Sequence, residues 1–86
     1  MSTVYESLPM QIGKHEWRAV VKPSTYFPGE HVIEYQWRRY ADDFWRRDTT
    51  WPTYNHNDGS YAGLPRTLRK LYDREKPQLA PFLTVP

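Results

Sequence analysis

The side chains that could carry catalysis or hold a metal are few and scattered in this sequence. Its histidines are His15, His31 and His56, and no pair shows the spacing of zinc ligands on a helix. There is no cysteine, which excludes disulfides, thiolate metal sites and thiol redox chemistry. His56 and Asp58 offer at most two ligands within a polar turn. We therefore predict no metal and no cofactor.

The sequence supports nucleophilic and acid–base catalysis no better than it supports a metal site. No serine lies in a Gly-x-Ser-x-Gly elbow, and glycine-rich phosphate loops are absent. Asp42 and Asp43 are adjacent, so on a strand they point to opposite faces and on a helix they diverge by about 100°. Neither arrangement suits a shared acid–base task. The sequence predicts no catalytic residues, and we predict that the protein is not an enzyme.

Aromatic rings interleaved with arginines are the most informative feature of the chain. Tryptophan, tyrosine and arginine dominate binding hot spots because they bury large areas at low entropic cost. Arginine outnumbers lysine eight to four, which favours planar, bidentate or stacked contacts. The run comprises Tyr35, Trp37, Arg38, Arg39, Tyr40, Phe44, Trp45, Arg46, Arg47 and Trp51. In so short a chain, Trp37, Phe44 and Trp45 serve equally well as core residues.

Two binding functions fit this run, and we rank a protein partner first. A small phage-type accessory factor or a peripheral assembly subunit acts in this way, by contact and without catalysis. The predicted contact residues for a protein partner are Trp45, Arg46, Arg47, Trp51 and Tyr54. The alternative is a nucleic-acid-binding module, in which bases stack on rings and guanidinium groups meet phosphates. Its predicted contact residues are Arg38, Arg39, Arg66, Arg69, Lys70 and Arg74.

A helix is predicted over residues 65–76. Pro65 suits the first helical position, where its missing N–H is harmless, and Pro77 is expected to end the helix. An apolar stripe recurs at helical spacing: Leu64, Leu68, Leu71 and Tyr72. The segment carries a net charge of +3, which exceeds the +2 of the whole chain. Residues 77–86 contain three prolines and are predicted to form an extended tail.

The central segment decides the fold class. Residues 17–22 alternate like a strand, and so do residues 31–39, which are rich in β-branched and aromatic side chains. A turn at Ala41-Asp42-Asp43 then leads to a second strand over residues 44–51. We predict an α+β fold, in which a small antiparallel sheet packs against the C-terminal helix. The alternative is a mainly α protein with a long central helix at about 30–48, supported by acid–base pairs four residues apart.

Length and charge limit the remaining possibilities. A chain of 86 residues builds one small domain, 1–86, with a core made of rings because only 38% of its residues are hydrophobic. The net charge of +2 is small for a protein that coats DNA. No apolar stretch approaches the roughly 18 residues of a membrane span, and no signal peptide is readable. We expect an intracellular, for example cytoplasmic, location and no membrane partner.

Overall fold

Alternating apolar and polar residues build an antiparallel sheet that forms one layer of the molecule. The computed structural model describes residues 3–25, 28–52 and 64–82, and for residues 49–52 the backbone alone. The strands run in the order β1-β3-β4-β5, and β2 pairs with β3 beside β1. Their bounds are Tyr5–Glu6 (β1), Met10–Ile12 (β2), His15–Pro23 (β3), His31–Arg38 (β4) and Arg46–Pro52 (β5).

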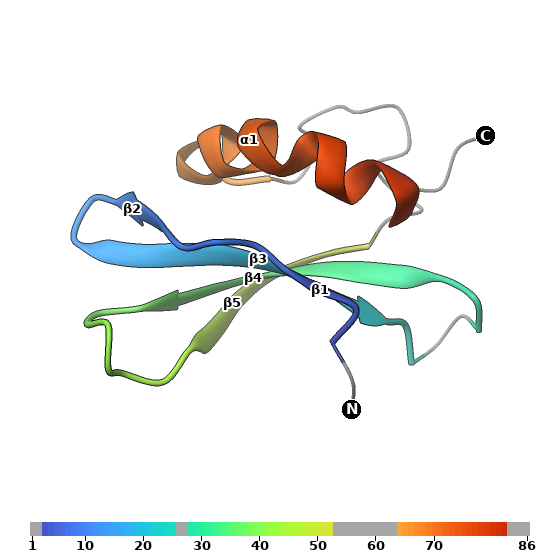
Figure 1. Ribbon diagram of the computed structural model, residues 1–86, viewed down its shortest axis with the longest axis horizontal. Coiled ribbons are helices and arrows are strands. Elements are labelled where there is room, and N and C mark those ends of the chain that lie inside the picture. The colour runs from blue at the N-terminus through green and yellow to red at the C-terminus, as the bar shows by residue number, and fades with distance from the viewer. Residues whose placement is uncertain (1–2, 26–27, 53–63, 83–86) are drawn as a thin grey trace.

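One helical layer covers a single face of this sheet (Figure 1). The α-helix α1 spans Arg69–Leu79, preceded by the 3₁₀ turn η2 at Arg66–Leu68 and followed by η3 at Ala80–Phe82. The prediction of an α+β fold with a C-terminal helix on an antiparallel sheet is therefore confirmed. Within the described part of the chain, no helix is long and apolar enough to cross a membrane.

The alternative of a long central helix over residues 30–48 is wrong. β4 pairs with β3 so that Trp37 faces Trp17 and Tyr35 faces Ala19, which aligns the apolar positions of both strands on one face. Glu34, the acid of the first of these helical pairs, binds Lys22 of β3 instead. Burial of a continuous sheet face outweighs helical ion pairs, each of which is worth about 0.2–0.5 kcal/mol.

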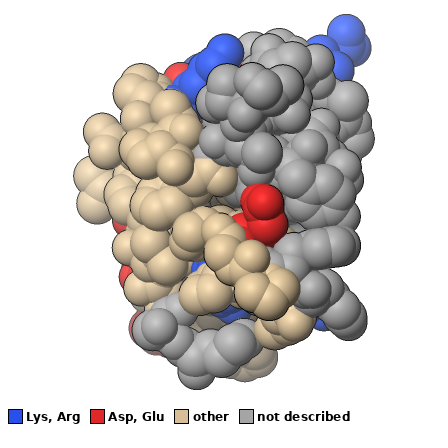
Figure 2. Space-filling view, turned by 90° about the vertical axis from the view of Figure 1, so that its right-hand side faces the viewer, with Lys and Arg blue, Asp and Glu red and all other residues tan. Residues whose placement is uncertain are grey.

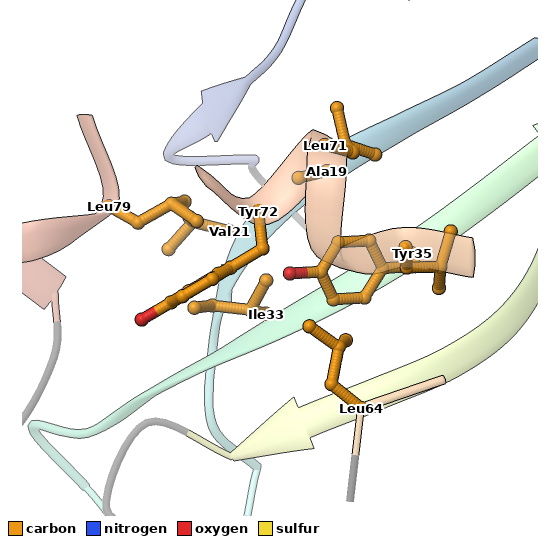
Figure 3. Packing of buried hydrophobic residues seen from close by; sticks show 9 residues of the cluster. Ala19, Val21, Ile33, Tyr35, Leu64, Leu71, Tyr72 and Leu79 are labelled. Carbon is orange, nitrogen blue, oxygen red and sulfur yellow. The ribbon is translucent and has the colours of Figure 1, made fainter. Parts of the chain in front are cut away.

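The core lies between α1 and the two central strands. Leu71, Tyr72 and Leu79 of α1 are fully buried, as is Leu68 of η2. Figure 3 shows the α1 side chains gathered against residues of β3 and β4, namely Ala19, Val21, Ile33 and Tyr35. Burial raises the pKa of the Tyr35 hydroxyl well above its ordinary value. The predicted apolar stripe is thus the face by which the helix packs on the sheet.

The predicted end of the helix is wrong. Pro77 lies inside α1, which continues to Leu79, so the expected extended tail is helical over residues 77–82. A proline in a helix costs about 3 kcal/mol because it removes a hydrogen bond and crowds the preceding turn. Here Leu79 is fully buried and Phe82 packs against the core, so tertiary contacts outweigh that cost. Residues 83–86 of the predicted tail lie outside the described residues.

Two connections lie side by side at one end of the sheet, beyond the start of α1 (Figure 1). β2 and β3 are joined through Gly13 and Lys14, and Gly13 has a φ of 62°. That positive φ at the first of two central residues gives the type II′ turn that suits a twisted hairpin. The longer β4–β5 loop covers residues 39–45. This end of the sheet carries the candidate binding surface.

Candidate binding surface

The β4–β5 loop is an ordered turn built around Asp43. The backbone N–H of Asp43 donates to the carbonyl oxygen of Tyr40 at 3.0 Å. The Asp43 carboxylate accepts two bonds, from the backbone N–H of Phe44 at 2.9 Å and from Nη1 of Arg46 at 2.8 Å. The bond from Arg46 is the main cause of a lowered pKa of the Asp43 carboxyl. The loop therefore has a defined shape before any partner arrives.

This turn presents two aromatic rings to solvent. Tyr40 and Phe44 are each 68% exposed. The guanidinium carbon of Arg46 lies 4.3 Å from the ring centroid of Phe44 and 5.2 Å from that of Trp37. Arg46 thus connects the exposed ring to the sheet by cation–π contacts. We refer to Arg39, Tyr40, Phe44 and Arg46 as the loop surface.

Half-buried rings on the α1 side of the sheet support the loop surface. The ring centroids of His15 and Trp37 are 4.8 Å apart in an edge-to-face arrangement, and those of Trp17 and Trp37 are 6.5 Å apart. Such contacts are typical of aromatic packing. His15, Trp17 and Trp37 are neither fully buried nor fully exposed. The aromatic run therefore divides into a supporting layer on the strands and exposed rings on the loop.

The opposite face of the sheet, which we call the outer face, carries a hydrogen-bonded polar network. Glu34 is buried and accepts bonds from Nζ of Lys22 at 3.1 Å and from Nε2 of Gln36 at 2.6 Å. Gln36 in turn accepts a bond from Nε of Arg18 at 2.8 Å. Trp45 joins this face, because the guanidinium carbons of Arg18 and Arg38 lie 4.4 and 4.2 Å from its ring centroid.

The structure separates the residues predicted to bind a protein partner. Trp45 and Arg46 are neighbours in sequence but lie on opposite faces, Trp45 on the outer face and Arg46 on the α1 side. Arg47 is exposed and pairs with Gln36 of β4, which places it on the outer face. The side chain of Trp51 and the whole of Tyr54 lie outside the described residues.

The residues predicted to bind nucleic acid are divided as well. Arg38 lies over Trp45 on the outer face, and Arg39 is exposed on the β4–β5 loop. The remaining cations are exposed on the helical layer, across the sheet from Trp45: Arg66, Arg69, Lys70 and Arg74. A nucleic-acid strand that stacked on Trp45 would therefore not reach the helical cations directly. The guanidinium groups over Trp45 also occupy ring surface that a base would need.

Arg74, one of the helical cations, is engaged within the fold. Arg74 binds Glu75 at 2.7 Å and donates to the carbonyl oxygen of Leu8, while Tyr5 donates to Glu75. These bonds tie the β1–β2 edge to α1. Figure 2 shows Lys and Arg atoms projecting along the upper edge of the molecule, on the side of α1. The basic character of the helical layer is thus visible at the surface.

The sequence-based selection missed four surface or supporting residues: Tyr40, Phe44, His15 and Trp17. Phe44 is 68% exposed, so it is not the core residue that it could equally have been. Tyr40 belonged to the aromatic run, and its position beside the Ala41-Asp42-Asp43 turn was the signal that marked it as a loop-tip ring. The contact of His15 with Trp37 joins separate strands, so local sequence spacing does not reveal it.

Neither metal grouping nor likeness to a known protein adds a function to this surface. Among the described residues, no three His, Asp or Glu side chains are grouped as a metal ion would require. Comparison of the chain with protein-family models, with curated proteins and with solved structures finds no match in any of the three.

Proposed function

We propose that this protein is a non-catalytic interaction module that docks onto a protein partner through the loop surface. The observation that carries the proposal is the pair of 68% exposed rings, Tyr40 and Phe44, on a turn held by hydrogen bonds. An accessory factor or a peripheral assembly subunit would act in this way. The partner contact would bury these rings, as hot-spot residues are buried at interfaces.

The order of the loop matters because binding costs conformational entropy. Fixing a mobile side chain at an interface costs about 0.5–1.5 kcal/mol. Asp43 already positions Phe44 through its backbone, and Arg46 already lies over the ring. The loop surface therefore keeps more of its contact energy as affinity than a mobile loop would.

The charges beside the rings indicate the chemistry of the partner. Arg39 is exposed on the loop, and Lys14 is exposed in the neighbouring β2–β3 turn. Asp42 is the exposed acid of the loop itself. We propose a partner with an apolar pocket for the rings and carboxylates at its rim, since complementary charges guide docking.

The test compares binding by a variant that loses the two loop rings with binding by a control variant that loses an exposed apolar side chain elsewhere. Phe44→Ser combined with Tyr40→Ser removes both rings, whereas Leu8→Ser removes a residue that is 78% exposed at the β1–β2 break. A partner isolated with the tagged wild-type protein is purified and titrated against each variant. We expect the double variant to lose at least about tenfold in affinity, a change of about 1.4 kcal/mol, and Leu8→Ser to bind like wild type. Equal binding by all three proteins would refute docking through the loop surface.

A second candidate function, binding to nucleic acid, is favoured by the charge of the helical layer alone. Residues 64–82 carry a net charge of +3, and their cations are exposed, although Arg74 also contacts the β1–β2 edge. The apolar residues and Tyr72 of this layer face the core, so its described outer surface offers charge without rings. We therefore propose that any nucleic-acid binding uses this layer and contacts phosphates rather than bases.

A further inference from the structure

Two arginines on neighbouring strands each contact one indole ring on the outer face. Arg18 of β3 is paired with Gln36 of β4, so Arg38 is its diagonal neighbour on the same face. The guanidinium carbons of Arg18 and Arg38 lie 4.4 and 4.2 Å from the ring centroid of Trp45. Both side chains are largely buried, with 19% and 18% of their surface exposed.

Arg18 has no close ion pair among the described contacts. Its Nε donates to the neutral amide oxygen of Gln36 at 2.8 Å. Its carboxylate partner Glu6 is 3.4 Å from Nη1 and is itself half exposed. Arg38 has a closer partner, because its Nε binds Glu16 at 2.7 Å. A guanidinium has five N–H donors, so both arginines keep donors beyond these bonds.

The two guanidinium groups also disfavour each other. Burial is the main cause that lowers the pKa of Arg18, and the positive charge of Arg38 lowers it further, whereas the negative charges of Glu6 and Glu34 raise it. An anion that contacted both groups would relieve this repulsion and would use the remaining N–H donors. Planar guanidinium forks bind the paired oxygens of carboxylates and phosphates in a bidentate manner.

We propose that Arg18 and Arg38, held over the ring of Trp45, form a binding site for an oxyanion, either a carboxylate or a phosphate group. Trp45 supplies the surface that orients both forks, and Gln36 and Glu16 occupy the two Nε atoms. The ligand would bind the Nη donors and would compete with the long contact from Nη1 of Arg18 to Glu6. The site lies across the sheet from Arg46 and the rings that support it. The proposed oxyanion site can therefore be tested independently of docking through the loop surface.

Titration with small anions tests the site directly. Two-dimensional ¹H–¹⁵N NMR follows the indole N–H of Trp45 and the Nε–H groups of Arg18 and Arg38. The protein is titrated with inorganic phosphate, with acetate and with chloride at constant ionic strength. We expect saturable shifts of these three signals with phosphate or acetate but not with chloride. The oxyanion that binds with the higher affinity identifies the natural ligand group as phosphate or carboxylate.

Variants then distinguish anion binding at this site from a nonspecific effect of anions on the positive charges of the protein. Arg38→Lys keeps the charge but removes the planar fork, so the affinity for the oxyanion should fall by about tenfold. The amide signals of core residues show whether Arg38→Lys disturbs the fold. If it does, Arg18→Lys on β3 provides the same test. Arg47→Gln removes one exposed positive charge from the same face and should leave the affinity within twofold, a limit of about 0.4 kcal/mol.

Three results would overturn the proposal. They are equal shifts with chloride, a linear response to both oxyanions, and a loss of affinity in Arg47→Gln as large as that in Arg38→Lys.

Discussion

The guanidinium carbon of Arg46 lies 4.3 Å from the ring centroid of Phe44, yet Phe44 remains 68% exposed. The contact fixes the position of the ring without covering it. The next residue, Trp45, is engaged on the outer face by Arg18 and Arg38. Just before β5, Phe44 is thus exposed to solvent, whereas Trp45 packs against two arginines of the outer face.

The pKa of Asp43 reports whether the loop is held by Arg46. The bond from Arg46 is the largest cause that lowers this pKa, so Arg46→Gln should raise it toward its ordinary value. A lowered pKa contributes stability above the pKa of the unfolded chain, and this is lost as the pH falls through the folded value. Carboxyl NMR titration of Asp43 in both proteins measures the change. An unaltered pKa in Arg46→Gln would show that Arg46 does not hold the turn in solution.

Removal of a core leucine should destabilise the whole domain. Leu68, the last residue of η2, is fully buried, so Leu68→Ala should lower the free energy of unfolding by about 2–5 kcal/mol. Leu8→Ala is the matched control, because Leu8 is 78% exposed and its truncation should change stability by less than about 0.5 kcal/mol. Thermal unfolding followed by circular dichroism compares the two. Similar midpoints for Leu68→Ala and wild type would mean that the helical layer does not pack on the sheet as described.

The bond from Tyr5 to Glu75 should be visible in alkaline titration. Burial, the hydrogen bond to Glu75 and its negative charge raise the pKa of Tyr5 to about 12. An unfolded tyrosine ionises near pH 10, so this stabilisation is present below about pH 10 and is lost as the pH rises toward 12. Glu75→Gln removes the charge and should lower the pKa of Tyr5, measured by NMR of its ring. A pKa near 10 in the wild-type protein would contradict the contact.

Local alternation in the sequence predicted much of the sheet, because each strand reveals its buried face by its own pattern. Trp17, Ala19 and Val21 share the face that contacts α1, as the period of two required. The helix beyond Pro77 was not predictable in this way. Its continuation depends on the burial of Leu79 against residues distant in sequence. The prediction that Pro77 ends the helix considered only the local cost of a proline in a helix.

The candidate surface was less predictable than the fold. The sequence identified the segment that is rich in aromatic rings and arginines, but it did not show which face of the sheet α1 would cover. Trp45 and Arg46 point to opposite faces because side chains alternate along a strand, and packing of α1 on the side of Arg46 leaves the helical cations across the sheet from Trp45. The covered face is decided by packing between remote elements. The exposure of Tyr40 follows from a turn that the sequence did indicate, whereas Phe44, which was predicted to begin the second strand, lies in the loop instead.

Salt dependence tests the proposed phosphate contacts of the helical layer. If duplex DNA binds there, Arg66→Gln combined with Lys70→Gln should reduce the slope of log affinity against log salt by up to about two units. Arg39→Gln combined with Arg47→Gln removes equal charge from the loop and β5 and should alter the slope by much less. Fluorescence anisotropy with a labelled duplex measures each slope. Absence of binding at low salt, or equal reductions in both double variants, would exclude the helical layer as a nucleic-acid site.

Photo-crosslinking from the loop tip measures docking through the loop surface most directly. Benzoylphenylalanine replaces Phe44 in one protein and Leu8 in another, both positions being exposed. Each protein is irradiated in the cells from which the chain comes, and the adducts are identified by mass spectrometry. The account predicts one discrete protein adduct from position 44 that is absent from position 8 and is lost when Tyr40→Ser and Arg46→Gln are added. The same adducts from both positions, or a discrete adduct from position 8 alone, would contradict it.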